Sequence, residues 1–265
     1  MRRVSQSGLC MAVLAFCAYA FAPFTAKADT QTIRSADSAI WGSFGTSLFN
    51  YKESITPIPD SEHGWLPSFA AGMSNMTNNN LYVALEGTSS FGDASYKGAY
   101  YYAPTVPLQG TTTETISTID GKIGRGFAIG SRVMLVPYAE LGFRYWDRNL
   151  GSGQIEKYQN FVFLGGTMLQ FSPTDRLILS AYGAAGTTFA AQMKTAGDTY
   201  TLGNAGAYKL GGKIGYNIAP RVELFTSLDL DHFHYVQSGV VAGAYEPSSF
   251  SSDTAWRVGL SYHLR

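Results

Sequence analysis

The sequence predicts an all-β protein, a transmembrane antiparallel up-and-down β-barrel of about ten strands, with eight or twelve strands as alternatives. Three observations carry this prediction. Apolar and polar residues alternate along many segments, as they do when a strand turns one face to lipid and the other to a polar interior. Residues 29–265 contain no apolar run long enough for a membrane-spanning helix. The connections between the alternating segments are short and long in turn.

Residues 1–28 have the pattern of a signal peptide. Two arginines precede a mostly apolar stretch at positions 9–24, and the small residues Ala26 and Ala28 fit a cleavage site. The apolar stretch is too short to cross a bilayer comfortably, although an N-terminal membrane anchor is the alternative. We therefore expect a mature chain that forms a single barrel domain, residues 29–265.

Cysteine and charge restrict the chemistry of this mature chain. Cys10 and Cys17, the two cysteines of the sequence, both lie in the predicted signal peptide, so we expect no disulfide and no thiol chemistry. The whole chain has 19 basic and 19 acidic residues, and the signal peptide removes three basic ones, which leaves 16 against 19. A net charge near −3 excludes a strongly basic nucleic-acid-binding protein.

Ten segments have the length and composition of strands, and most reach the 9–11 residues that a tilted strand needs to cross the hydrocarbon layer. In order they are Ile40 to Lys52, Trp65 to Met76, Leu81 to Phe91, Thr113 to Ile129, Val136 to Arg148, Tyr158 to Phe171, Arg176 to Phe189, Ala207 to Ile218, Val222 to Tyr235 and Thr254 to Leu264. The alternation is clear in the fifth, where Ala139 and Leu141 oppose Glu140 and Arg144. In the first, second, sixth and seventh, either face could be the outward one.

The last strand has an unbroken apolar face, and the chain ends directly after it. Trp256, Val258 and Leu260 alternate with Arg257 and Gly259, and the pattern continues to the C-terminus. In a barrel such a strand closes the cylinder against the first one.

The end of this strand resembles the C-terminal signal of bacterial outer-membrane proteins. The resemblance implies recognition by the barrel-assembly machinery, through the signal residues Gly259, Leu260, Tyr262 and Leu264.

The lengths of the connections predict an orientation. The connections 77–80, 130–135, 172–175 and 219–221 are short, whereas 54–64, 92–112, 149–157, 192–206 and 237–253 are long and rich in Gly, Ser, Tyr and Pro. Outer-membrane barrels have short periplasmic turns and long external loops. We therefore expect both termini on the periplasmic side of the cell outer membrane.

Two further stretches resemble the small outer-membrane barrels of the porin family. They are the segment Tyr138 to Arg148 and the Gly-Trp-Leu-Pro sequence at 64–67. The resemblance implies a Gram-negative cell-envelope protein and a barrel, without a particular substrate, because one fold serves many functions. A secreted β-sandwich or a lipocalin-like barrel is the soluble alternative, but it would not place so many charged residues mid-strand opposite apolar ones.

Charged residues at mid-strand are the candidate lumen lining. They share the face opposite the apolar one and are Glu86, Asp120, Lys122, Glu140, Arg144, Lys209, Lys213, Glu223, Asp229 and Arg257. Two interpretations are open: a lumen filled by paired long side chains, or a narrow pore lined with both signs of charge. Glu140 with Arg144 and Lys213 with Glu223 are the pairs that we expect.

Enzymatic alternatives fit the sequence less well. Ten-stranded barrels include the omptin family of surface proteases, which use Asp and His pairs at the outer rim. Here Asp229 and Asp231 share the lumen face, whereas His232 and His234 share the opposite one. A lipid-modifying barrel would need Ser, His and an acid together on the lipid face, and His263 lies on the lumen side. We expect no enzyme activity, no cofactor and no metal.

The expected function is therefore structural, or a narrow porin-like passage of small solutes. The alternative is a surface binding or adhesion barrel that acts through the Tyr-rich segment Tyr96 to Tyr102 and through residues 237–253. The expected partners are outer-membrane lipid and lipopolysaccharide, the barrel-assembly machinery and small solutes, but no nucleic acid.

Overall fold

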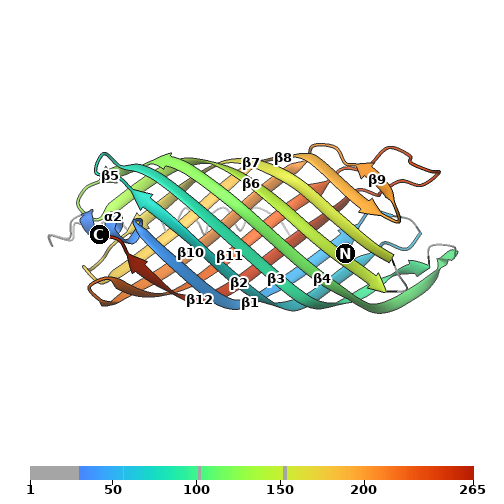
Figure 1. The fold of residues 1–265 in the computed structure, drawn as a ribbon, viewed down its shortest axis with the longest axis horizontal. Helices are drawn as coiled ribbons and strands as arrows, with labels where there is room; N and C mark the ends of the chain where they lie inside the picture. Colours follow the sequence, from blue (N-terminus) through green and yellow to red (C-terminus); the bar gives the residue numbers. More distant parts are fainter. Residues whose placement is uncertain (1–29, 56, 101–102, 152–153) are drawn as a thin grey trace, which may run out of the picture.

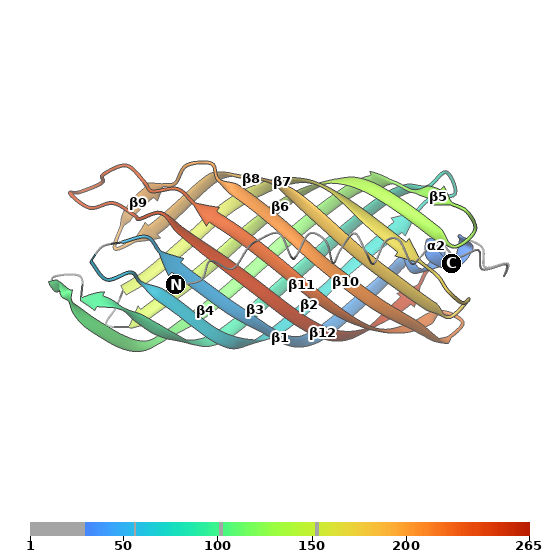
Figure 2. The same ribbon diagram turned by 180° about the vertical axis from the view of Figure 1, so that it is seen from behind.

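The computed structural model describes residues 30–55, 57–100, 103–151 and 154–265, and it shows a closed antiparallel barrel (Figure 1, Figure 2). The predicted signal peptide, residues 1–28, lies outside the described residues. No helix in the described ranges has the length and apolarity that a membrane span requires. The helix α2 (Gln31–Ala36) leads into the first strand.

All ten predicted strands are present, and the predicted count is confirmed. The barrel strands are β1 (Ala39–Glu53), β2 (Ser61–Met76), β3 (Leu81–Tyr100), β4 (Ala103–Arg125), β6 (Val133–Gly151), β7 (Gln154–Phe171), β8 (Leu177–Thr195), β10 (Gly206–Ala219), β11 (Val222–Tyr235) and β12 (Ser249–His263). Two short strands lie outside this set. β5 (Phe127–Ile129) pairs with β6, and β9 (Asp198–Thr201) pairs with β8. β5 is the end of the predicted strand Thr113 to Ile129, which the structure interrupts after Arg125.

The barrel closes as the last strand predicts. β12 pairs with β1 in an unbroken register from Ala39 opposite His263 to Glu53 opposite Ser249. The pairing of β8 with β10 completes the circuit beside the short strand β9. Within the described residues each of the ten barrel strands therefore pairs with a neighbour on both sides, so the barrel itself has no free edge.

The two ends of the barrel differ (Figure 1). The C-terminus, α2 and the short turns lie at one end, which we call the short-turn end. The long hairpins lie at the other, which we call the hairpin end. This arrangement agrees with the alternation of connection lengths in the sequence.

Three of the five long connections, 92–112, 149–157 and 192–206, are largely strand in their described residues, so their prediction as loops was wrong. The described residues of 54–64 and 237–253 lie mostly outside strands, as predicted. β3 and β4 continue to Tyr100 and Ala103, so residues 92–112 form a hairpin whose tip, residues 101–102, lies outside the described residues. Alternation cannot predict these extensions, because beyond the lipid layer both faces of a strand are polar. The backbone ladder continues there all the same.

The outer face carries an apolar belt. Large apolar side chains are exposed on it, and Phe44 is 66% and Leu141 54% exposed. One such residue from each of nine barrel strands is Phe44, Phe69, Leu85, Ile123, Leu141, Phe163, Ile214, Leu228 and Leu260. Soluble proteins seldom expose a continuous apolar surface of this size, whereas lipid-facing barrels do. Leu260, Tyr262 and Leu264 of the predicted insertion signal lie on this face.

Candidate functional site

The inside of the barrel holds the candidate site, and all ten predicted lumen-lining residues have their side chains there. Seven of them surround one central cavity: Glu86, Asp120, Lys122, Arg144, Lys209, Asp229 and Arg257. The other three lie in ion pairs with inward neighbours: Glu140, Lys213 and Glu223.

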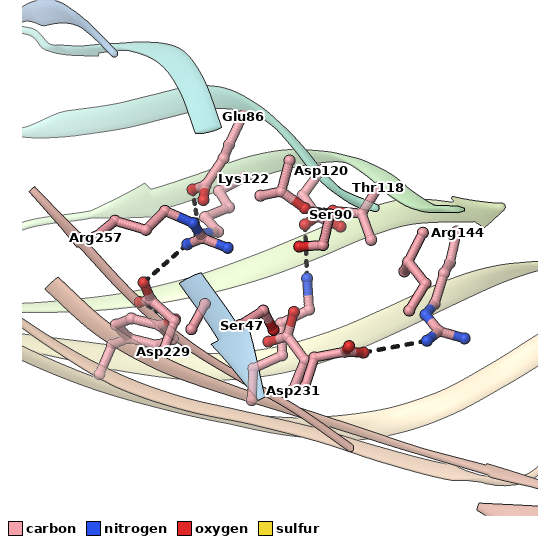
Figure 3. Close-up of a pocket in the computed structure, with 16 residues that line it drawn as sticks. Ser47, Glu86, Ser90, Thr118, Asp120, Lys122, Arg144, Asp229, Asp231 and Arg257 are labelled. Carbon is pink, nitrogen blue, oxygen red and sulfur yellow. Dashed lines mark hydrogen bonds and ion pairs between the residues drawn. The ribbon is translucent and has the colours of Figure 1, made fainter. Parts of the chain in front are cut away.

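Two lysines organise the central network. Lys209 is buried, and its Nζ lies 2.6 Å from Asp120 Oδ2 and 2.7 Å from Glu140 Oε1. Lys122 lies 3.5 Å from Glu86 and 3.9 Å from Glu140. Because its members come from β3, β4, β6 and β10, the network connects the barrel walls across the lumen. Figure 3 shows Asp120, Lys122 and Glu86 directed into the same space.

Two arginines extend this network. Arg257 donates to Asp229 Oδ2 at 3.1 Å (Figure 3). It also donates to Ser68 Oγ at 3.0 Å. Arg144 is 1% exposed and donates to Asp253 at 3.1 Å and to Tyr235 Oη at 2.7 Å. Each guanidinium is thus held by a carboxylate and a hydroxyl, as buried charges require.

One of the two expected pairs is present and the other is not. Lys213 Nζ lies 2.6 Å from Glu223 Oε1. Glu140 binds Lys209 instead of Arg144, so that prediction was wrong. Positions four apart on one strand are separated by about 13 Å, whereas closure of the barrel brings a residue of a distant strand within reach.

The cavity that remains among these side chains is small. Its volume is about 30 Å³, which is room for roughly two water molecules. Ser47, Thr118 and Asp231 are among the other residues that line it (Figure 3). Small-molecule sites usually measure about 300–1,000 Å³, so this cavity is far too small for one.

An aromatic cluster fills the lumen towards the hairpin end. Trp146 is fully buried, stacks on Tyr158 at 4.5 Å, and meets the edges of Tyr51 and Phe49 at 4.9 and 5.5 Å. Tyr235 continues the cluster at 5.7 Å from Tyr158. These residues occupy the inward-facing positions of their strands, so their rings lie in the interior and not at the bilayer interface.

Beyond the aromatic cluster lies a group of acids that the sequence analysis missed. Five buried glutamates surround Arg148, and we call them the acid cluster: Glu53, Glu62, Glu114, Glu156 and Glu246. They lie in or next to segments predicted as loops. Four of them, all except Glu246, occupy inward-facing positions of barrel strands, and that alternation was the signal that could have identified them.

Arg148 is the centre of this group. It forms ion pairs with Glu62 at 2.9 Å, Glu53 at 3.0 Å and Glu156 at 2.7 Å. The other two acids are held by rings. Trp146 donates to Glu114 at 2.6 Å, and the Tyr158 hydroxyl donates to the fifth acid, in the β11–β12 connection.

The acid cluster lies between the apolar belt and the hairpin end. Its members on β1 and β2, Glu53 and Glu62, are closer to that end than Leu48 and Trp65, which mark the limit of the belt. Burial raises the pKa of Glu53 to about 7, against the opposing effect of Arg148. Burial likewise raises the pKa of Glu62 to about 8, and the neighbouring Glu114 adds to the rise. One arginine does not balance five acids, so part of the cluster is protonated at neutral pH.

The short-turn end is closed by apolar side chains. Ile33 of α2 is fully buried and belongs to a cluster with Met76, Tyr82, Met134 and Val136. The lumen is therefore filled at three levels: apolar side chains, central ion pairs, and the aromatic and acid clusters.

The residues considered for enzyme chemistry are held apart. Asp229 faces the lumen, where Tyr182 donates to it at 3.0 Å, and Asp231 also lines the central cavity. His232 and His234 lie on the outer face, beside Ser252 and Ser248. Among the described residues no three His, Asp or Glu side chains are arranged to hold a metal ion.

Comparison with known proteins gives no relative by sequence. No protein-family model matches the chain. The search of curated proteins gives no match either.

Solved structures, in contrast, are similar in fold. The outer-membrane protease OmpT from Escherichia coli matches with a TM-score of 0.55 and 9% identity, over 86% of this chain and 97% of that one. The translocator domain of the autotransporter NalP from Neisseria meningitidis matches with a TM-score of 0.38 and 10% identity, over 96% and 97%. Neisserial surface protein A matches with a TM-score of 0.36 and 13% identity, over 85% and 97%. At these identities the likeness concerns the fold alone: this chain has the barrel fold of outer-membrane proteins.

Proposed function

We propose that this protein is an integral outer-membrane β-barrel with a closed lumen, which serves the structure of the cell envelope and does not act as an open pore. The observation that carries the proposal is the filling of the lumen at three levels. The central level leaves only about 30 Å³ among buried ion pairs.

The apolar belt supports the membrane location, and the two ends support an orientation. In the proposed orientation the short-turn end faces the periplasm and the hairpin end faces the outside, as in other outer-membrane barrels. α2 then closes the periplasmic mouth, because Ile33 packs among residues of the barrel wall.

Energetics favour a lumen that stays closed. Opening the central level would separate Lys209 from Asp120 and Glu140, and each buried ion that loses its partner costs several kcal/mol. The aromatic cluster adds a second barrier, because Trp146 and Tyr158 bury their rings against each other. A solute path would require both the central ion pairs and the stacked rings to separate.

Single-channel recording in planar lipid bilayers tests the proposal. The purified barrel, shown to be folded by its heat-modifiable migration on a gel, should give no ohmic steps at either polarity. An open porin in the same bilayer is the control. Steady ohmic steps from the folded barrel would support the narrow porin-like passage instead.

We also propose that the protein is not an enzyme. The placement of Asp229 and Asp231 inside the barrel, and of His232 and His234 outside, supports this. Incubation of the folded barrel with peptides and with lipid A should give no turnover. Turnover that disappears in the Asp229→Asn, Asp231→Asn double variant would contradict the proposal.

A further inference from the structure

Five basic side chains lie on the outer face of the barrel, just beyond the apolar belt and on one side only. We call them the basic band: Lys52, His63, Lys97, His232 and His234. They come from β1, β2, β3 and β11, which together with β12 are five neighbours in the sheet (Figure 2). Three of the four histidines of the chain belong to this band, so these residues are concentrated here and not spread around the barrel.

The strand register places the band in two adjacent rows. The first row passes, in order of pairing, through Lys97, Ser61, Lys52, Phe250 and His234. Neighbouring strands are about 4.8 Å apart, so this row extends about 19 Å around the barrel. No acid stands between its members.

The second row lies two residues nearer the belt. It passes through His63, Asn50, Ser252, His232 and Tyr208. His232 is held in place, since its Nδ1 lies 2.7 Å from Ser252 Oγ and its ring stacks on Tyr208 at 4.6 Å. Its imidazole is therefore oriented before any ligand arrives.

The charge of the band is not balanced on the protein itself. Within the described residues, Lys52 and Lys97 have no ion pair, and the outward faces of these five strands carry a single acid, Asp93. That carboxylate already accepts a hydrogen bond from Thr113 at 2.9 Å. The acids beside the first row on β1 and β2, Glu53 and Glu62, point into the lumen, so on these strands the outside is positive where the inside is negative.

The opposite side of the barrel differs. There Lys157 forms an ion pair with Asp147 at 3.8 Å. Lys194 lies opposite Lys157 on the neighbouring strand. Asp198 lies opposite Thr195, the residue after Lys194. Charges of both signs thus stand together on that side.

We propose that the basic band binds the phosphate groups of phosphorylated glycolipids in the leaflet around the hairpin end. The inference rests on the proposed outer-membrane location. Trp65, 67% exposed, lies two residues from His63 on the outer face of β2, at the edge of the belt, so acyl chains packed on the belt bring headgroup phosphates near the lysines. Lysine ammonium groups bind phosphate as point charges, and imidazole N–H groups add hydrogen bonds.

Lipid retention tests this proposal. The full mature barrel is placed in nanodiscs that contain phosphorylated lipid A, or the same lipid after phosphatase treatment, and the lipid that stays bound is counted by native mass spectrometry. The Lys52→Gln, Lys97→Gln variant should bind the phosphorylated lipid about 30-fold more weakly, because each lysine near an anionic surface contributes about fivefold.

Three comparisons decide the outcome. The matched control Lys157→Gln, Lys194→Gln removes the same charge from the other side and should retain the lipid. Replacement of both band lysines by arginine should retain it as well. Equal retention by wild type and the Lys52→Gln, Lys97→Gln variant would overturn the proposal.

Equal retention of the dephosphorylated lipid would overturn the proposal too, and so would complete displacement of the lipid by inorganic phosphate. Heat-modifiable migration establishes that each variant is folded. A folded, non-conducting barrel without selective lipid retention contradicts this inference alone. A conducting barrel contradicts only the closed lumen.

Discussion

Replacement of Arg148 by methionine should destabilise the hairpin end strongly and in a pH-dependent way. The guanidinium forms three ion pairs at 2.7–3.0 Å, and every side chain involved is at most 8% exposed, so water cannot take its place. Methionine keeps much of the apolar stem, so the loss is mainly electrostatic. Removal of one partner from a buried pair costs about 3–5 kcal/mol, and we expect this loss at pH 8.

The sign of the pH dependence follows from the raised pKa values. In the folded wild type the pKa of Glu53 is about 7 and that of Glu62 about 8, above the ordinary value of 4.5. The stability that these acids contribute is fully present below pH 4.5 and is lost as the pH rises through 7 to 8. Without the arginine both pKa values rise further, so Arg148→Met should cost less at pH 5 than at pH 8.

Urea unfolding in phospholipid vesicles, followed by tryptophan fluorescence, measures this effect. Lys157→Met is the matched control, because its ion pair with Asp147 is 3.8 Å long and its side chain is 51% exposed. An exposed pair contributes about 0–1 kcal/mol, with little dependence on pH. A loss below about 1 kcal/mol for Arg148→Met at pH 8, or an equal loss at both pH values, would refute the reasoning.

Four further substitutions test other levels of the barrel by the same unfolding measurement. Gly259→Val should cost about 1–3 kcal/mol, because a side chain there would meet the carbonyl oxygen of Gly42 on the neighbouring strand; a neutral result would contradict this close approach. Lys209→Met should cost about 3–5 kcal/mol, and Lys213→Met should cost less, because the Lys213 side chain is 31% exposed. A larger loss for Lys213→Met would contradict the view that the central network contributes most to stability. Trp146→Ala should cost about 3–5 kcal/mol, and an unchanged stability would show that the aromatic cluster is not packed as described.

The sequence predicts the membrane part of the fold well, because lipid imposes a period of two on every strand. β6 illustrates this: Leu141 lies outside, whereas Glu140 and Arg144 lie inside. Beyond the belt the period disappears, since water meets the outer face and polar side chains meet the inner one. The strand extensions that carry Glu62 and Glu156 therefore read as loops.

The partners inside the lumen could not be predicted in the same way. Lys213 and Glu223 lie on the adjacent strands β10 and β11, so their pairing follows from one hairpin. Lys209 and Glu140 come from strands that are not neighbours and meet across the interior. Such a contact depends on the width and register of the closed barrel, which no single segment specifies.

The closed lumen is the central claim, and conductance tests it most directly. A folded barrel in a planar bilayer should remain electrically silent at both polarities, because buried ion pairs leave a cavity of about 30 Å³ between the apolar short-turn end and the aromatic and acid clusters. Steady ohmic steps from the same folded preparation would contradict the claim.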